Sequence, residues 1–212
     1  MEIILEHVTK CIHKNKVLED INLILKSGLV YGLCGYNGSG KTMLLRILSG
    51  LIMPTSGKVI VDGKILGKEI DFPDSMGIMI ENPAFLDDFT GKENLELIMS
   101  IKNKIDKNEL SNCLNRVGLA DSKDMKYKKY SLGMKQRLGI AAAFMEKPDL
   151  VLLDEPTNAL DEEGIQMVEN LILEMKERQR LIVIASHEKE FIQKVTDIVY
   201  KMDKGRICIE EN

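Results

Sequence analysis

The sequence predicts an α/β fold with a mainly parallel core sheet, an N-terminal antiparallel β subdomain and a helical subdomain insertion. Three observations lead to this prediction. Strand patterns separated by turns dominate the first third of the chain, helical periodicity dominates the middle, and strands alternate with helices in the last third. The 212 residues suffice for one substantial core. We expect a single domain over 1–212, with a core lobe of about 1–82 and 147–212 and a helical lobe of about 83–146.

The individual elements follow from hydrophobic spacing and turn residues. Strand patterns occupy 3–6, 17–25, 29–33 and 58–61, and the last of these precedes an Asp-Gly turn. Apolar residues recur at helical spacing from about 91 to 145. After Pro148 the pattern predicts strands at 150–153, 181–185, 198–202 and 206–210, with a long helix over 162–178. This alternation is typical of a parallel sheet that is covered by helices.

Composition excludes several functional classes. The chain has 29 Lys and Arg against 33 Asp and Glu, so its net charge of −4 provides no global positive field, and we expect no nucleic acid partner. Its longest strictly apolar runs are about five residues, far below the roughly 20 that a membrane span requires. The acidic, strand-like start does not resemble a secretory signal, so we expect a cytoplasmic protein.

A phosphate-binding loop is the strongest functional signal. The segment GYNGSGKT at 35–42 matches the GxxxxGK[ST] pattern between an apolar strand and a helical segment at 43–49. Its glycines allow backbone N–H groups to surround a phosphate at the positive end of the following helix. Lys41 adds a cation for the phosphate oxygens, and the Thr42 hydroxyl suits Mg²⁺. The expected nucleotide-binding residues are Gly35, Asn37, Gly38, Ser39, Gly40, Lys41 and Thr42.

A second element specifies hydrolysis chemistry. The apolar strand at 150–153 ends in Asp154 and Glu155, as a buried parallel strand that leads into an active site would. Because neighbouring strand residues face opposite sides, the two acids can have different roles. We expect Asp154 to hold Mg²⁺ through its waters and Glu155 to polarise the attacking water.

A third element, YSLGMKQR at 130–137, precedes that strand and opens a helix whose N-cap we expect to be Ser131. In this order, the phosphate loop, YSLGMKQR, the Asp-Glu strand, PTNALD at 156–161 and ASH at 185–187 resemble the ATP-binding cassette (ABC) family. The resemblance covers essentially the whole chain and implies the P-loop NTPase fold of ABC ATPases. The SLGMKQR form is similar to that of small drug-export and peptide-antibiotic (bacitracin and lantibiotic type) transport ATPases.

The resemblance implies a head-to-tail dimer with two ATP molecules between its copies. Ser131 and Gly133 would then contact the γ-phosphate of the partner's ATP, again through a helix N-terminus. Asp161 resembles the residue that crosses the dimer interface, and His187 resembles the histidine that contacts the γ-phosphate and orients water. One copy alone is therefore expected to be a poor hydrolase, and Lys41, Glu155 and His187 are the expected catalytic residues.

The sequence departs from the family pattern in three segments. Ile12 occupies the place of the aromatic residue that usually stacks on adenine, which predicts weaker base stacking and relaxed nucleotide specificity. Glu81 replaces the usual Gln, so the expected Mg²⁺ ligands Thr42, Asp154 and Glu81 include an extra carboxylate near the γ-phosphate. YSLGMKQR resembles the signature sequence of the family, in which Leu132 and Met134 replace Gly and Gln.

A GTPase is one alternative, because 103–106 spells the NKxD guanine-recognition pattern. Its context argues against this alternative. No DxxG sequence accompanies the pattern, and Asp106 with Glu109 three residues later is typical of a helix capping box.

Within the resembled family, the alternative to a transport subunit is a soluble ATPase that acts on ribosomes or DNA. Such members carry two cassettes with basic extensions, or a long coiled coil, and neither feature occurs here. We therefore expect a transport subunit that powers a separate membrane permease and lies on the inner face of the membrane through it. The docking surface would be the helical lobe and the loop 81–90, in which Phe85, Leu86 and Phe89 are either docking anchors or core residues.

Overall fold

The computed structural model describes residues 1–81, 83–101 and 107–209. Its N-terminal part is an antiparallel sheet with strand order β2-β1-β4-β5. The strands are β1 (Glu2–Ile12), β2 (Asn15–Lys26), β4 (Ser56–Val61) and β5 (Lys64–Ile65). β1 extends well beyond its predicted end at 6, because register shifts between Leu5 and Cys11 interrupt the alternation of apolar residues that marks a strand in sequence.

The second sheet forms the centre of the molecule, with strand order β10-β9-β3-β8-β7-β6. Its strands are β3 (Val30–Cys34), β6 (Met76–Met79), β7 (Leu150–Asp154), β8 (Leu181–Ser186), β9 (Ile198–Asp203) and β10 (Arg206–Ile209). Neighbouring strands from β9 to β6 pair in parallel, and β10 pairs with β9 in antiparallel orientation. Every residue of β7 and β8 is buried, as is typical of central parallel strands.

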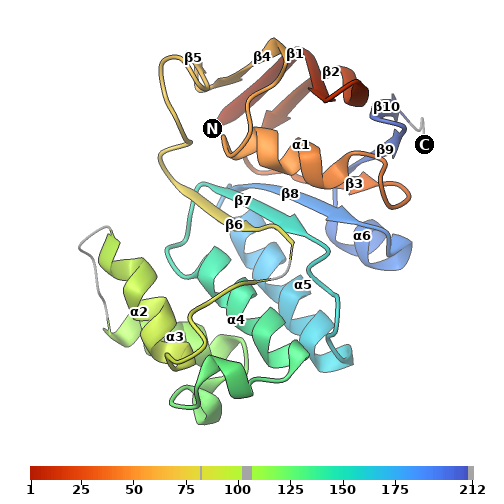
Figure 1. Cartoon of the computed structure of the whole chain (residues 1–212). Helices are drawn as coiled ribbons and strands as arrows, with labels where there is room; N and C mark the ends of the chain where they lie inside the picture. Colours follow the sequence, from red (N-terminus) through yellow and green to blue (C-terminus); the bar gives the residue numbers. More distant parts are fainter. Residues whose placement is uncertain (82, 102–106, 210–212) are drawn as a thin grey trace.

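Helices cover both faces of this sheet (Figure 1). α1 lies between the core sheet and the N-terminal strands, whereas α4 and α5 lie on the opposite face, with α2 and α3 beside them. The α-helices are α1 (Lys41–Leu48), α2 (Gly91–Ile101), α3 (Lys107–Arg116), α4 (Leu132–Phe144), α5 (Glu162–Glu177) and α6 (Lys189–Val195). Two 3₁₀ turns, Ala120–Ser122 and Tyr127–Lys129, connect α3 to α4.

The core sheet separates two hydrophobic clusters. Along β7, Leu150 and Leu152 face the cluster beneath α1, and Val151 and Leu153 face the cluster that includes residues of α4 and α5. The alternation follows from the pleat, which points successive side chains to opposite faces. Burying each such leucine or valine contributes about 2 kcal/mol. The sheet is thereby held on both faces, which makes its carboxyl edge a rigid support for side chains.

The predicted α/β class and the predicted strands are confirmed, and α4 differs in length. The apolar pattern predicts the helix over 138–145, after the expected cap at Ser131. The helix begins at Leu132, directly after that cap, where the Ser131 hydroxyl accepts a hydrogen bond from the N–H of Met134. α4 belongs to the predicted helical lobe, 83–146, yet it also packs against β6 and β7. The lobe boundaries remain predictions. The expected cap at Asp106 lies outside the described residues.

Among the described residues, no helix combines the length and the apolar character that crossing a membrane would require.

Candidate active site

The predicted site residues meet at one edge of the core sheet. β3, β8, β7 and β6 run in parallel, so their carboxyl ends lie side by side (Figure 1). The phosphate loop follows β3, and Glu81 follows β6. Asp154 ends β7 and Glu155 follows it, and His187 follows β8. In open α/β sheets this edge is where ligands bind.

The phosphate loop has the backbone that its glycines permit. Gly38 and Gly40 have φ values of 80° and 106°, in the left-handed region that favours glycine. Gly40 caps α1, and a Cβ there would lie 2.9 Å from the Val17 carbonyl oxygen. The loop therefore presents the N-terminus of α1, where backbone N–H groups have no helical partner.

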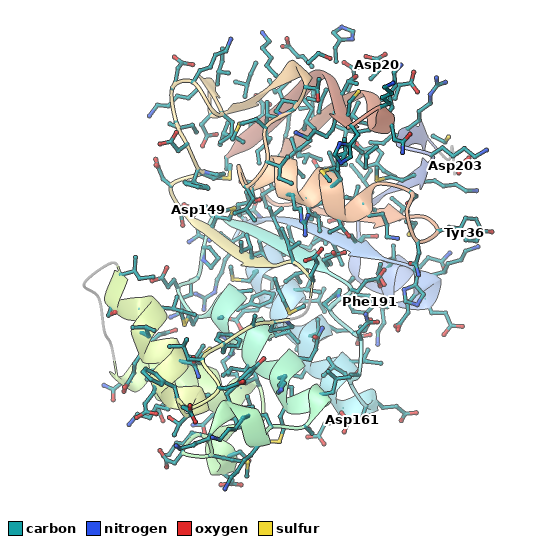
Figure 2. The ribbon with its side chains drawn as sticks, in the orientation of Figure 1. Asp20, Tyr36, Asp149, Asp161, Phe191 and Asp203 are labelled. Carbon is teal, nitrogen blue, oxygen red and sulfur yellow. The ribbon has the colours of Figure 1, made fainter. Side chains whose placement is uncertain are left out.

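Lys41 is drawn into this loop. Its side chain is almost fully buried, with 5% of the residue exposed. The ammonium donates hydrogen bonds to the carbonyl oxygens of Gly35 at 2.7 Å and Tyr36 at 3.4 Å. Tyr36 itself points away from the body of the molecule and is 86% exposed (Figure 2), so its ring does not cover the loop.

Thr42 and Asp154 form the expected metal-binding pair. The Thr42 hydroxyl donates a hydrogen bond to Asp154 Oδ2 at 2.7 Å. Asp154 is 6% exposed, and its Oδ1 is the only buried carboxylate oxygen without a hydrogen-bond partner within the described part of the chain. Burial, reinforced by the nearby charge of Glu155, raises the pKa of the Asp154 carboxyl. A buried carboxylate oxygen with no partner, beside a hydroxyl, fits a hard cation such as Mg²⁺.

Glu155 adopts a left-handed backbone with φ 47°, an arrangement that costs of order 1–3 kcal/mol in a residue with a side chain. The turn is held by Gln136 of α4, whose buried amide donates to the carbonyl oxygens of Glu155 and Pro156, both at 3.1 Å. No role for Gln136 was predicted from the sequence. The available signal was an amide side chain on a helix whose following residues, from Leu138 onward, are mostly apolar.

The Glu155 carboxylate is fixed by three neighbours. Its Oε2 accepts hydrogen bonds from the Ser186 hydroxyl at 3.1 Å and the His187 backbone N–H at 3.3 Å. The same oxygen lies 2.8 Å from His187 Nδ1, and Oε1 lies 3.8 Å from the Lys41 ammonium. The structure thus brings together the predicted catalytic residues Lys41, Glu155 and His187.

The two predicted phosphate contacts in YSLGMKQR, Ser131 and Gly133, do not line the pocket that holds this group. A pocket of about 390 Å³ beside the phosphate loop is lined by Glu81, Gln136, Asp154, Glu155 and Asn158. Ser131 and Gly133 are not among these residues. Ser131 is exposed at the start of α4, and the next residue, Leu132, is 66% exposed. Gly133 packs closely against the segment after β7, because a Cβ there would lie 2.9 Å from the Ala159 carbonyl oxygen.

A larger cavity of about 940 Å³ lies between the first two strands and the β9–β10 hairpin, and it contains none of the predicted site residues. Size alone does not indicate a function for this cavity.

Asp161 has a role within the chain. Its carboxylate caps α5 by accepting a hydrogen bond from the Gly164 N–H at 2.9 Å, and it pairs with Arg137 of α4 at 2.9 Å. These contacts, the Gly164 N–H first, lower the pKa of the Asp161 carboxyl. Figure 2 shows the exposed side chain at the start of α5. Asp161 therefore joins two helices at the surface.

Glu81 lines the pocket, but its carboxylate forms an ion pair with Arg46 of α1. Arg46 was not predicted from the sequence, because the two residues are 35 positions apart and belong to different elements. Ile12 ends β1 with its side chain exposed. The NKxD pattern at 103–106 lies outside the described residues.

Phe85, Leu86 and Phe89, in the loop before α2, were expected to be docking anchors or core residues, and their environments differ. Phe85 packs edge-on against Tyr127, with the ring centroids 5.3 Å apart. Leu86 and Phe89 are exposed.

Known proteins resemble this chain over most of its length. Residues 18–158 match the family model described as ABC transporter. An uncharacterized ABC transporter ATP-binding protein, YybJ of Bacillus subtilis (strain 168), is 47% identical over 97% of this chain and 94% of its own length. The bacitracin transport ATP-binding protein BcrA of Enterococcus faecalis is 37% identical over 98% of this chain and 68% of the relative. The lantibiotic transport ATP-binding protein SrtF of Streptococcus pyogenes is 33% identical over 98% of this chain and 89% of the relative.

Solved structures agree with the sequence comparisons. The dimeric structure of MJ0796, a bacterial ABC transporter cassette, superposes with a TM-score of 0.90 at 26% identity, over 99% of this chain and 98% of that one. A dimeric post-hydrolysis state of the MJ0796 cassette, bound to ADP and Pi, gives a TM-score of 0.89 at 25% identity over the same shares. The chain therefore belongs to the ABC transporter family, and its cassette is an ABC ATPase.

Proposed function

We propose that this chain is the ATP-binding and ATP-hydrolysing subunit of an ABC transporter that powers a separate membrane permease exporting a drug or peptide. The observation that carries the proposal is the position of Glu155. It stands on a left-handed turn between the phosphate-loop lysine and His187, at the carboxyl edge of a parallel sheet. A phosphate loop alone would not distinguish hydrolysis from phosphoryl transfer to another substrate.

ATP would bind with its phosphates on the loop 35–42. The N–H groups at the start of α1 face the phosphates, and the Lys41 ammonium would exchange its carbonyl partners for phosphate oxygens. Thr42 and Asp154 would hold Mg²⁺, which when bound supplies charge neutralisation on the phosphates. Within the described ranges, no three His, Cys, Asp or Glu residues are arranged to hold a metal ion by themselves, so waters and phosphate oxygens would complete the coordination of the ion.

In the hydrolytic step, Glu155 accepts a proton from water while the water oxygen attacks the γ-phosphorus and the bond to the ADP oxygen breaks. Ser186 and the His187 backbone N–H hold one carboxylate oxygen in place. His187 is exposed beside Glu155, and its ring would contact the γ-phosphate. Such positioning is worth several kcal/mol of barrier in comparable reactions.

A second copy would complete the site in a head-to-tail dimer. Ser131 and Gly133, which do not line the pocket of their own chain, would contact the γ-phosphate bound by the partner. Asp161 would lie at the interface beside them, since Arg137 ties it to the signature helix. The dimeric structures of the MJ0796 cassette support the formation of a dimer.

The permease would dock on the loop before α2 and on the helical lobe, and it would hold the cassette on the inner face of the membrane. Leu86 and Phe89 are exposed there and provide apolar contacts, whereas Phe85 is engaged with Tyr127. The names of BcrA and SrtF, bacitracin and lantibiotic transport proteins, favour a peptide or drug as cargo. A soluble ATPase on ribosomes or DNA is the second candidate, and the net charge of −4 argues against nucleic acid.

The substitution Glu155→Gln tests the proposal. It keeps the shape of the side chain and removes the base, so ATP affinity should stay within about twofold while steady-state hydrolysis falls by roughly a thousandfold. ATP should also hold the variant as a dimer in light-scattering measurements. Glu177→Gln at the exposed end of α5 is the matched control. Near wild-type hydrolysis by Glu155→Gln would remove Glu155 from the role of base.

A further inference from the structure

Arg46 and Glu81 form an ion pair at the margin of the phosphate pocket, and the mechanism above gives the pair no role. Glu81 has a left-handed backbone with φ 62°, and its side chain is 60% exposed. The Arg46 side chain is half as exposed, at 30%. An inference from this pair rests on the proposed function, because it assumes that ATP binds in this pocket.

Two side chains on one face of α1 contact residues at the ends of the neighbouring strands β7 and β6. Thr42 and Arg46 are four residues apart and lie on the same face of the helix. Thr42 bonds to Asp154 at the end of β7, and Arg46 pairs with Glu81 beyond β6. β6 and β7 pair in parallel, and Glu81 beyond β6 and Asp154 at the end of β7 line the same pocket. The Arg46 pair is therefore continuous with the metal-binding pair.

The ion pair between Arg46 and Glu81 affects the net charge around the pocket. Glu81, Asp154 and Glu155 place three carboxylates around a pocket that is expected to receive a triphosphate. The Lys41 ammonium lies 3.8 Å from Glu155, and the Arg46 guanidinium is bonded to Glu81. Without that guanidinium, the Glu81 charge would repel phosphate oxygens across a partly buried pocket, where Coulomb energies exceed those in water.

We propose that Arg46 is a positioning residue for nucleotide binding, which holds the Glu81 carboxylate away from Asp154 Oδ1 and cancels its charge. A carboxylate can then stand next to the phosphates without weakening ATP binding. The guanidinium suits this task because it stays charged and binds carboxylates in a fixed geometry.

The test is a double-mutant cycle on ATP affinity, measured with fluorescent ATP on the purified full chain, in EDTA and in Mg²⁺. Arg46→Met should weaken ATP binding roughly fivefold by exposing the Glu81 charge, and the loss should shrink at high salt. Glu81→Gln alone should strengthen binding slightly. The double variant should recover to within about twofold of wild type, because the charge that Arg46 neutralises is gone. Arg46→Lys keeps a cation and should lose less affinity than Arg46→Met.

Two results would overturn the inference. If Arg46→Met caused the same loss of affinity in the wild-type chain and in the Glu81→Gln variant, Arg46 would act without Glu81. A loss of Mg²⁺-dependent affinity in Glu81→Gln would make Glu81 a metal ligand. If Arg46→Met does not fold, Arg46→Gln takes its place in the same cycle.

The pair formed by Arg116 of α3 and Glu174 of α5 is the matched control. Neither residue lines the pocket, so Arg116→Met and Glu174→Gln should show no coupling in ATP affinity. Absence of ATP binding by the wild-type chain would contradict the proposed function itself, which distinguishes the two failures.

Discussion

The carboxyl edge of the core sheet and the start of α4 carry the two parts of the expected chemistry, and they differ in completeness. At the sheet edge, Glu155 already has its hydrogen-bond partners, and Asp154 already has Thr42. At the start of α4, Ser131 caps the helix and is otherwise exposed, and it does not line the pocket of its own chain. One chain therefore brings the predicted hydrolytic groups together, whereas the phosphate contact proposed for Ser131 would need a second copy.

After Glu155→Gln, the variant with the strongest predicted loss of activity is Ser131→Arg, which changes the exposed start of α4. Ser131→Arg places a bulky cation where the partner's nucleotide would lie, so steady-state ATP hydrolysis should fall about a hundredfold or more. ATP binding to the isolated chain should persist, because Ser131 does not line the pocket.

Hydrolysis assays and light scattering with ATP check this prediction. Ser111→Arg on the exposed face of α3 controls for the added bulk and charge. Unchanged turnover with ATP-induced dimers in Ser131→Arg would contradict the trans contact.

A smaller loss of activity is expected when the support of Glu155 at the sheet edge is removed. Gln136→Met removes two hydrogen bonds and leaves the carbonyl oxygens of Glu155 and Pro156 without them. We expect about a tenfold lower kcat, because the left-handed turn that aims Glu155 loses its support, with little change in ATP affinity.

Single-turnover hydrolysis and binding measurements separate these two quantities. Gln166→Met on the exposed face of α5 is the matched control. An equal fall in affinity and in kcat would show that Gln136 shapes the whole pocket rather than the turn.

The smallest expected effect concerns stability. Burial raises the pKa of Asp154 in the folded chain, so folding favours the protonated form. The stability that this carboxyl contributes is full below its ordinary value of 3.8 and is lost as pH rises through the raised value. Asp154→Asn should therefore raise Tm of the nucleotide-free chain in EDTA by about 3 °C at pH 7.5, equivalent to roughly 1 kcal/mol.

Thermal unfolding followed by circular dichroism measures this shift, and the difference from wild type should close as pH falls toward 4. Asp203→Asn on the exposed end of β9 is the control. A variant that is less stable at pH 7.5 would show that the Thr42 hydrogen bond outweighs the cost of burial.

Local sequence patterns predicted most of the fold and the named site residues. The phosphate loop, the strand ending in Asp154 and the cap at Ser131 each depend on neighbouring residues, so spacing and residue type suffice to identify them. Contacts between distant segments were not predicted in the same way. Gln136 reaches Glu155 across 19 positions, and Arg46 reaches Glu81 across 35.

Local patterns of residues suffice to identify a phosphate loop, an acid suited to Mg²⁺ and a candidate base in the order of an ABC cassette. The contacts that position these residues are visible only in the folded chain. The order β3-β8-β7-β6 places the ends of four strands side by side, and α1 and α4 pack on opposite faces of the sheet. The physical reason is that hydrophobic periodicity specifies elements, whereas hydrogen bonds and ion pairs form only between groups that sheet order and helix packing bring within about 3 Å.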